Sequence, residues 1–251
     1  MLAVIASKAG WEGEGVPESN GFKITVSLNG PYIVSGGIPL AQQIIAADEE
    51  GNSRDWREGR TYDSASEYKL CRCGNSRNKP FCDGSHARLG FDGVESDSAR
   101  ASYAEQAVEY DGPERALTDA RQLCVGARFC DPDGTVWRLV ARTDDESIRD
   151  HFDGMVGNCP SGRLISWNRR AGEAIEPSRE PAIGVVEDPV LGVSGPLWVS
   201  GGIQIESGSD GYVYESRARM TLCRCGNSQN KPFCDGTHAA IGFRDDFWHA
   251  A

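Results

Sequence analysis

Two stretches of the chain repeat one arrangement of metal-binding side chains. Each stretch holds three cysteines and one histidine in the spacing C-x-C-x8-C-x3-H. The donors are Cys71, Cys73, Cys82 and His86 in the first stretch, and Cys223, Cys225, Cys234 and His238 in the second. Three thiolates and one imidazole are enough ligands for one metal centre. The stretches 71–86 and 223–238 differ at only two of sixteen positions, which indicates one duplicated site.

The spacing favours a centre with two metals over a site for a single ion. Cys71 and Cys73 are one residue apart and can hold one iron from an extended backbone. Cys82 and His86 are four residues apart, on one face of a helical turn, and can hold a second iron. A 2Fe–2S cluster needs such a pair for each iron. A mononuclear Cys3His zinc site is chemically possible, although zinc sites more often use Cys-x2–4-Cys spacing.

Both stretches resemble the CDGSH iron–sulfur motif, C-x-C-x2-[S/T]-x3-P-x-C-D-G-[S/A/T]-H, at every fixed position. The resemblance to these mitoNEET-like proteins implies one 2Fe–2S cluster per motif. It implies that Cys71 and Cys73 hold the inner iron, and that Cys82 and His86 hold the outer one. The second motif would use its donors in the same way. The relatives are dimers in which β-strands cover two cluster-binding lobes. Two copies in one chain therefore imply an internal pseudo-dimer, and a monomer rather than an obligate dimer.

The histidine ligand has two expected consequences. A neutral imidazole in place of a thiolate removes a negative charge, which should raise the reduction potential. A protonated imidazole cannot bind iron, so we expect clusters that become labile as the pH falls toward about 6. Basic residues near the donors either stabilise the reduced state or form a solvated basic rim. They are Arg72, Lys79 and Arg88 in the first copy, and Arg224 and Lys231 in the second.

Three further cysteines, Cys124, Cys130 and Cys159, lie between the two stretches. Single-cluster bacterial ferredoxins use C-x2-C-x2-C with a remote Cys-Pro. Here the first and third positions of the triplet are cysteines, the second is Ala127, and Cys159 precedes Pro160. The segment resembles the divergent mono-cluster ferredoxin domain.

The ligands of this middle segment leave several cofactors open. Three thiolates suit a 3Fe–4S cluster. A 4Fe–4S cluster would need a further ligand, such as Asp131, His151 or a small molecule. Buried free cysteines on an apolar helix, with no metal, would give a similar sequence. We expect His151 and His249 to be exposed to solvent rather than to act as ligands.

The patterning predicts an α+β fold with three domains. These are an N-terminal CDGSH lobe over 1–100, a ferredoxin-like domain over 101–178 and a C-terminal CDGSH lobe over 179–251. The lobes should be rich in β-structure, with strands at 22–28, 33–34, 183–186, 198–199 and 212–214. The first copy holds 13 more residues than the second, within 39–70. Asp83 and Asp235 are expected to be N-caps of short helices that carry the histidines.

The middle segment is expected to be a small βαβαβ insert. A strand at Val108-Glu109-Tyr110 should precede a helix over 118–130 that is capped by Thr118. The predicted elements that follow are a strand at 136–140, a helix at 146–156 and a strand at 164–167.

Composition limits the function classes. With 26 Lys+Arg against 37 Asp+Glu, the net charge of −11 excludes a general nucleic-acid or anionic-membrane binder. No apolar run approaches the ~20 residues of a membrane span. Nine cysteines cannot all pair as disulfides, and their clustering favours metal binding in a reducing compartment. Residues 1–6 are too short for a secretory h-region and no basic residue precedes them, so we expect a cytoplasmic protein.

Several clusters in one chain favour an electron-transfer protein. The histidine-ligated outer iron leaves a second interpretation open, a cluster donor, store or redox/pH sensor. No nucleotide-binding glycine loop, Walker loop or Ser-His-Asp constellation is recognisable, so no catalysis beyond electron transfer is expected. The expected partner is a redox protein or an apo-protein that accepts a cluster.

Overall fold

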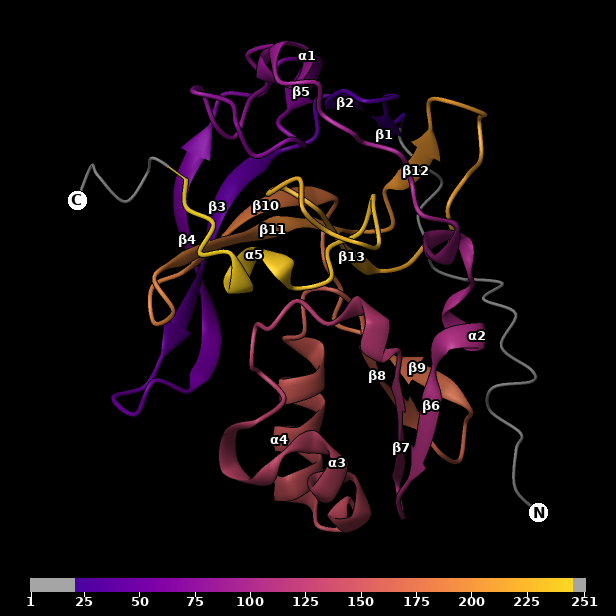
Figure 1. Ribbon diagram of the computed structural model, residues 1–251. Helices are drawn as coiled ribbons and strands as arrows, with labels where there is room; N and C mark the ends of the chain where they lie inside the picture. Colours follow the sequence, from indigo (N-terminus) through magenta and orange to yellow (C-terminus); the bar gives the residue numbers. More distant parts are fainter. Residues whose placement is uncertain (1–20, 246–251) are drawn as a thin grey trace.

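The protein is an α+β structure in which strands predominate over short helices, as the sequence predicts (Figure 1). The computed structural model describes residues 21–245. Two sheets are built by the segments that carry the CDGSH motifs, and a third sheet is built by the segment between them. Within the described part, no helix is both long and apolar enough to cross a membrane.

The first sheet joins three strands of the N-terminal segment to one strand of the C-terminal segment. Its order is β12-β1-β2-β5. The strands are β1 (Lys23–Val26), β2 (Tyr32–Ser35), β5 (Glu67–Leu70) and β12 (Gln204–Ser207). β1 and β12 run parallel, with Ile24 opposite Ile205. β1 confirms the strand that alternating apolar residues predicted over 22–28.

The second sheet joins three strands of the C-terminal segment to two strands of the N-terminal segment, in the order β13-β11-β10-β3-β4. Its strands are β3 (Leu40–Ala47), β4 (Ser53–Tyr62), β10 (Ala182–Asp188), β11 (Val193–Ser200) and β13 (Arg219–Leu222). β3 of the N-terminal segment runs parallel to β10, with Leu40 opposite Ile183. Leu40 and Ile205 both follow the shared Gly-Gly-Ile sequence by two residues. Equivalent strands of the two copies are therefore exchanged between the sheets.

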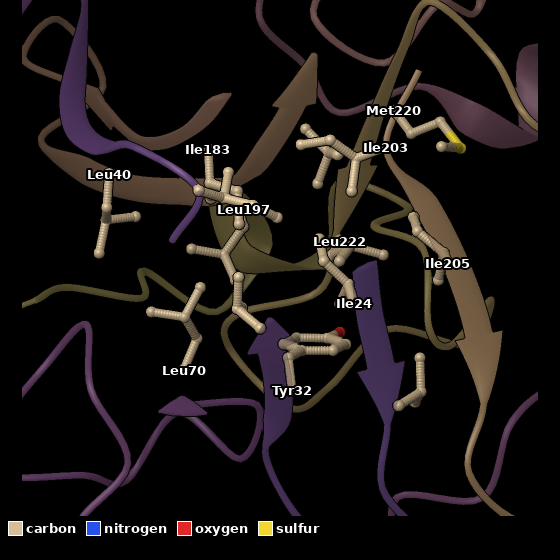
Figure 2. Close-up of a cluster of buried hydrophobic side chains, with 14 of the residues drawn as sticks. Ile24, Tyr32, Leu40, Leu70, Ile183, Leu197, Ile203, Ile205, Met220 and Leu222 are labelled. Atoms are coloured by element: carbon tan, nitrogen blue, oxygen red, sulfur yellow. The ribbon is translucent and has the colours of Figure 1, made fainter. Parts of the chain in front are cut away.

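The exchanged strands bury one common hydrophobic core, part of which is drawn in Figure 2. Tyr32 is fully buried there, and its hydroxyl donates to the carbonyl oxygens of Cys223 at 2.9 Å and Pro232 at 3.0 Å. The core also contains Ile24, Leu40, Leu70, Ile183, Leu197, Ile203, Ile205, Met220 and Leu222, from both copies. Burial of this shared apolar surface stabilises the two segments together.

The copies differ after the exchanged strands. The extra residues of the first copy fall where β3 and β4 form a long hairpin at the edge of the second sheet. In the second copy, the strand predicted at 212–214 is wrong, because only Val213 pairs, in an isolated bridge with Glu206. The backbone turns back there, because Gly211 has a φ of +75°, which lies outside the range of a β-strand.

The middle segment forms a four-stranded antiparallel sheet of order β6-β7-β8-β9. Its strands are β6 (Val108–Asp111), β7 (Arg115–Asp119), β8 (Leu164–Asn168) and β9 (Glu173–Ile175). Within residues 21–245, the α-helices are α1 (Ser85–Arg88), α2 (Tyr103–Gln106), α3 (Val136–Leu139), α4 (Glu146–Gly157) and α5 (Thr237–Ala240). The same described part contains 3-10 turns at Asp97–Arg100, Arg121–Leu123, Pro132–Gly134 and Val140–Arg142. β6, α4 and β8 confirm three predicted elements. The βαβαβ order is wrong, because β6 and β7 precede α3 and α4, and β8 and β9 follow them.

The helix predicted over 118–130 is absent for a physical reason. Its expected cap, Thr118, is part of β7, where its hydroxyl accepts a hydrogen bond from Trp167 Nε1 at 2.9 Å. Further along, Gly126 and Arg128 have φ values of +71° and +64°, which interrupt any right-handed helix. The segment after Leu123 is therefore an irregular loop.

The strand predicted at 136–140 is also wrong. The β-branched residues there suggested a strand, but Val136, Leu139 and Val140 are the buried positions. Their i, i+3, i+4 spacing is helical, and it places all three against the same core cluster as Phe152 of α4.

Candidate iron–sulfur sites

The first two cysteines of each motif follow directly after a strand. After β5, the Sγ atoms of Cys71 and Cys73 lie 3.8 Å apart. After β13, the Sγ atoms of Cys223 and Cys225 lie 3.9 Å apart. All four side chains are buried. The strand ends thus hold one pair of sulfurs together in each copy.

The other two donors of each motif lie on a turn and a short helix. Cys82 Sγ is 3.3 Å from Nδ1 of His86, and Cys234 Sγ is 3.3 Å from Nδ1 of His238. The two histidines lie in the first turns of α1 and α5, as predicted.

These spacings fit two donors on one tetrahedral metal. Metal–sulfur bonds of about 2.3 Å place two sulfurs about 3.8 Å apart, and a sulfur and a nitrogen about 3.5 Å apart. Each motif offers one pair of each kind. Among residues 21–245, no group of three or more His, Cys, Asp or Glu side chains is arranged to hold a single ion. The spacing of each donor pair suits one metal, so the two pairs of a motif suit a centre with two metals.

A carboxylate fixes the loop that carries the outer donors. Asp83 Oδ1 accepts from the Ser85 amide at 2.9 Å, and Oδ2 accepts from the Arg77 amide at 3.1 Å. These amides, that of Arg77 above all, hold the pKa of Asp83 below its usual range. Asp235 makes the equivalent bonds in the second copy. By backbone angles the N-caps are Gly84 and Gly236, so the prediction that Asp83 and Asp235 are the N-caps is wrong by one residue. Each carboxylate still accepts from the first amide of its helix.

The paired sulfurs make one thiol of each pair acidic. Hydrogen bonding to Cys73, and then to backbone amides, lowers the pKa of Cys71 to about 6. Hydrogen bonding to Cys225 likewise lowers the pKa of Cys223 to about 7. The partner thiols shift upward. Because metals bind thiolates, one ligand of each pair is ready at neutral pH and the other loses its proton on binding.

The outer pairs differ in exposure. Cys82 and His86 are half-buried, whereas Cys234 and His238 are only 2% and 5% exposed. Burial, followed by the charge of Arg224, lowers the pKa of His238 to about 4. Its imidazole is therefore neutral at pH 7, which is the form that ligates metals. The same motif thus lies in two different environments.

The inner loops of the two copies pack against each other. A Cβ on Gly74 would lie 2.4 Å from the carbonyl oxygen of Cys225, and a Cβ on Gly226 would lie 2.6 Å from that of Cys73. Both glycines have positive φ, +74° and +82°. Only glycine permits this close approach, so the two sites meet back to back. Sequence reasoning missed this junction, and its signal was a glycine that follows the second cysteine in both motifs.

Arg72 and Arg224 are each 1% exposed, so their interpretation as a solvated rim is wrong. Arg72 donates to the carbonyl oxygens of Ser27, at 3.0 Å, and Gly93. Each arginine therefore holds the loop between its two flanking cysteines against the rest of its lobe.

The structure brings the middle cysteines into one neighbourhood. Cys130 and Cys159 pack against the same core cluster. Burial, then the charge of Asp131, and then those of Cys159 and Cys124, raise the pKa of Cys130 to about 12. Cys124 lies on the irregular loop in place of the predicted helix. Cys130 and Cys159 thus lie beside α4, and Cys124 is near enough for its charge to act on Cys130.

The two protein side chains considered as a fourth ligand lie in different places. Asp131 Oδ1 is 3.7 Å from Cys130 Sγ. His151 Nε2 is 3.3 Å from Asp133 and its side chain is 41% exposed, as expected. His249 lies outside the described residues. Asp131 is thus the oxygen donor beside the cysteines.

Comparisons with known proteins assign both kinds of segment. Residues 29–87 and 194–239 match the family model described as iron-binding zinc finger CDGSH type. Residues 110–169 match the model described as divergent 4Fe-4S mono-cluster. No curated protein and no solved structure gave a significant match to the chain.

The fold, the donor pairs and these matches define an iron–sulfur protein. More specifically, the chain carries two CDGSH-type domains with a divergent 4Fe-4S mono-cluster domain between them, as its sequence predicts.

Proposed function

We propose that the protein transfers electrons and binds two 2Fe–2S clusters, each held by three cysteines and one histidine. The observation that carries the proposal is the division of each motif into a sulfur pair and a sulfur–nitrogen pair, each spaced for one metal. Cys71 and Cys73 would hold the buried inner iron of the first cluster, and Cys82 and His86 the outer iron.

A bound 2Fe–2S group supplies reversible one-electron redox chemistry. The chain's own residues set the conditions for it. The Gly84 amide points to Cys82 Sγ at 3.4 Å, and the Gly236 amide points to Cys234 Sγ at 3.5 Å. Hydrogen bonds to ligand sulfurs stabilise added negative charge and raise the potential. The neutral histidine acts in the same direction.

We propose that the two CDGSH lobes, over 1–100 and 179–251, form an internal pseudo-dimer around an insert at 101–178. The exchange of the equivalent strands β3 and β12 supports this, because each lobe completes the sheet of the other. The shared core would make the chain a monomer that contains both halves of a dimer.

We propose a third cluster in the insert, held by Cys124, Cys130 and Cys159. Their convergence supports it, as does the match of residues 110–169 to a 4Fe-4S domain model. Three thiolates alone would hold a 3Fe–4S cluster. With Asp131 as a fourth ligand, the same cysteines would hold a 4Fe–4S cluster.

Cluster donation, storage, or redox and pH sensing is the second candidate function. It is favoured by the partial exposure of Cys82 and His86, which leaves an outer iron open to an acceptor. Incubation with an apo-ferredoxin separates the candidates. Transfer of the cluster would support donation, whereas rapid reversible reduction with the cluster retained would support electron transfer.

The proposed partner is a redox protein or an apo-protein that accepts a cluster. We propose a cytoplasmic setting, in keeping with nine free cysteines, which a reducing compartment preserves.

The first test is iron and sulfide content after anaerobic purification. Two 2Fe–2S clusters require about four irons per chain, and a 3Fe–4S or 4Fe–4S cluster raises this to about seven or eight. Dithionite reduction should give an EPR signal and bleach the visible absorbance. A colourless protein with one zinc per motif and no iron would contradict the proposal.

A further inference from the structure

Two equivalent glycines of the CDGSH turns have different surroundings. Gly84 and Gly236 share nearly the same backbone angle, with φ +83° and +87°. A Cβ on Gly84 would meet nothing within 4 Å, whereas a Cβ on Gly236 would lie 3.1 Å from the carbonyl oxygen of Cys124. The middle loop therefore covers the turn of the second site and leaves the first turn open.

The covering loop is anchored to the C-terminal lobe. Arg128 Nη1 lies 2.6 Å from Asp188 Oδ2, and the Asp188 side chain is only 6% exposed. The next residue, Phe129, is 3% exposed and packs with Trp56 and Trp198. Its ring centroid is 4.9 Å from that of Trp56. An ion pair and an aromatic cluster together hold the loop against the turn.

The consequence is an asymmetry in a nearly symmetric pair. Because there is one insert and there are two sites, only one site can be covered in this way. Figure 1 shows α1 at an outer end of the molecule, while α5 lies on the side that faces the middle segment. The exposures agree, since Cys234 and His238 are buried and Cys82 and His86 are not.

The uncovered turn of the first site also carries more positive charge than the covered turn of the second site. From the glycine after the second cysteine to the phenylalanine after the helix, the first copy has three basic residues and one carboxylate. The second copy has one of each. The difference is Arg77 and Arg88, which are exposed and which correspond to Gln229 and Ala240. A cationic rim on a chain of net charge −11 is the complement of an acidic surface. Leu89, 62% exposed, adds apolar contact area beside Arg88.

We propose that the N-terminal site is where the protein meets an acidic electron-transfer protein, and that the middle loop closes the C-terminal site to partners. The C-terminal site then exchanges electrons only within the chain. Its two exchange partners are the N-terminal site, which meets it at Gly74, and the loop that carries Cys124 and Cys130. This inference rests on the proposed function, because it assigns different roles to the two proposed clusters.

The first experiment measures access to each site. One variant keeps only the C-terminal site (Cys71→Ser with Cys73→Ser), and the other keeps only the N-terminal site (Cys223→Ser with Cys225→Ser). A hydrophilic iron chelator should remove iron from the N-terminal site at least about tenfold faster. Adding Arg128→Gln and Phe129→Ala should accelerate release from the C-terminal site and leave the N-terminal rate unchanged. Equal rates in the two loaded variants would overturn the proposal.

Hydrogen exchange on the unmutated chain makes the same comparison without the cysteine substitutions and without depending on cluster loading. Amides of 234–240 should exchange more slowly than those of 82–88. Loosening the loop with Arg128→Gln and Phe129→Ala should remove the difference. Equal protection in the unmutated chain would overturn the closure. Absence of visible absorbance would instead contradict the proposed function, so the two failures are distinguishable.

The second experiment tests the rim with a pre-reduced acidic 2Fe–2S ferredoxin as the probe. The probe loses one electron and the N-terminal site gains it. Arg77→Gln with Arg88→Ala, which gives the first turn the residues of the second, should slow this step at least about threefold at low ionic strength. The effect should vanish at high salt, because screening removes the attraction. Gln229→Arg with Ala240→Arg is the matched control and should leave the rate unchanged. An unchanged rate in the first variant, or an equal gain in the control, would overturn the proposal.

Discussion

Arg224 forms a buried ion pair with Glu187, with 2.8 Å between Nη2 and Oε1. A second carboxylate, Asp245, lies 3.1 Å from Nη1 of the same guanidinium. Arg224 lies between Cys223 and Cys225, so the network fixes the backbone that carries the inner sulfur pair. Arg72 has the equivalent position in the first copy.

We expect Arg224→Met to destabilise the protein by about 3–5 kcal/mol, because it removes the cation that faces two buried carboxylates. Arg72→Met is the matched control. It removes hydrogen bonds to backbone carbonyls and the contacts of the guanidinium with the rings of Tyr32 and Phe91, and should cost about 1–3 kcal/mol. Urea unfolding of the iron-loaded variants measures both changes. Equal losses for the two arginines would contradict the assignment.

Gly74→Ala should destabilise the junction between the sites. Its positive φ alone costs about 1–3 kcal/mol for a residue with a side chain, and the added methyl would also meet the Cys225 carbonyl. Gly90→Ala separates these effects, because Gly90 has a φ of +61° and open space around it. We expect Gly74→Ala to cost about 1–3 kcal/mol more than Gly90→Ala in thermal unfolding, and to reduce iron retained at both sites. Equal costs would show that the close approach has no energetic role.

The candidate donors and their pairing could be predicted from the sequence because duplication exposes them. Cys71 and Cys223 lie in sixteen-residue stretches that vary at two positions, and local spacing alone predicts which donors pair. The pairing of β1 with β12 could not be predicted from the sequence, because parallel pairing between distant segments leaves no local sequence pattern. The resemblance suggested a pseudo-dimer but not which strands exchange.

The middle segment shows where local patterns fail. Residues 136–140 contain β-branched residues, yet helical packing against Phe152 decides their structure. At Arg128, an ion pair and the burial of Phe129 stabilise a positive φ that no propensity favours. The loop covers Gly236 only because of these tertiary contacts. The two motif sequences are nearly identical, so they could not reveal which of the two turns is covered.

Replacing a ligand histidine tests the role of its charge. In His86→Cys, a thiolate replaces a neutral imidazole, and the extra negative charge disfavours the reduced state. We expect a cluster that is retained, with its potential lowered by on the order of 100 mV. EPR-monitored redox titration measures the shift, with His238→Cys as the companion for the buried site. A potential that does not move in either variant would contradict ligation by these imidazoles.

Substitutions of the middle cysteines test the third cluster. Cys124→Ser with Cys130→Ser should remove the iron in excess of about four per chain and leave the 2Fe–2S absorbance intact. Asp131→Asn distinguishes the two cluster types, because losing a fourth ligand converts a 4Fe–4S to a 3Fe–4S cluster and lowers the content by about one iron. A 3Fe–4S cluster held by the three cysteines alone would be unaffected by that change. If the double cysteine variant keeps the full iron content of the unmutated chain, the middle segment holds no cluster, and Cys130 and Cys159 serve only to pack against the core around Phe152.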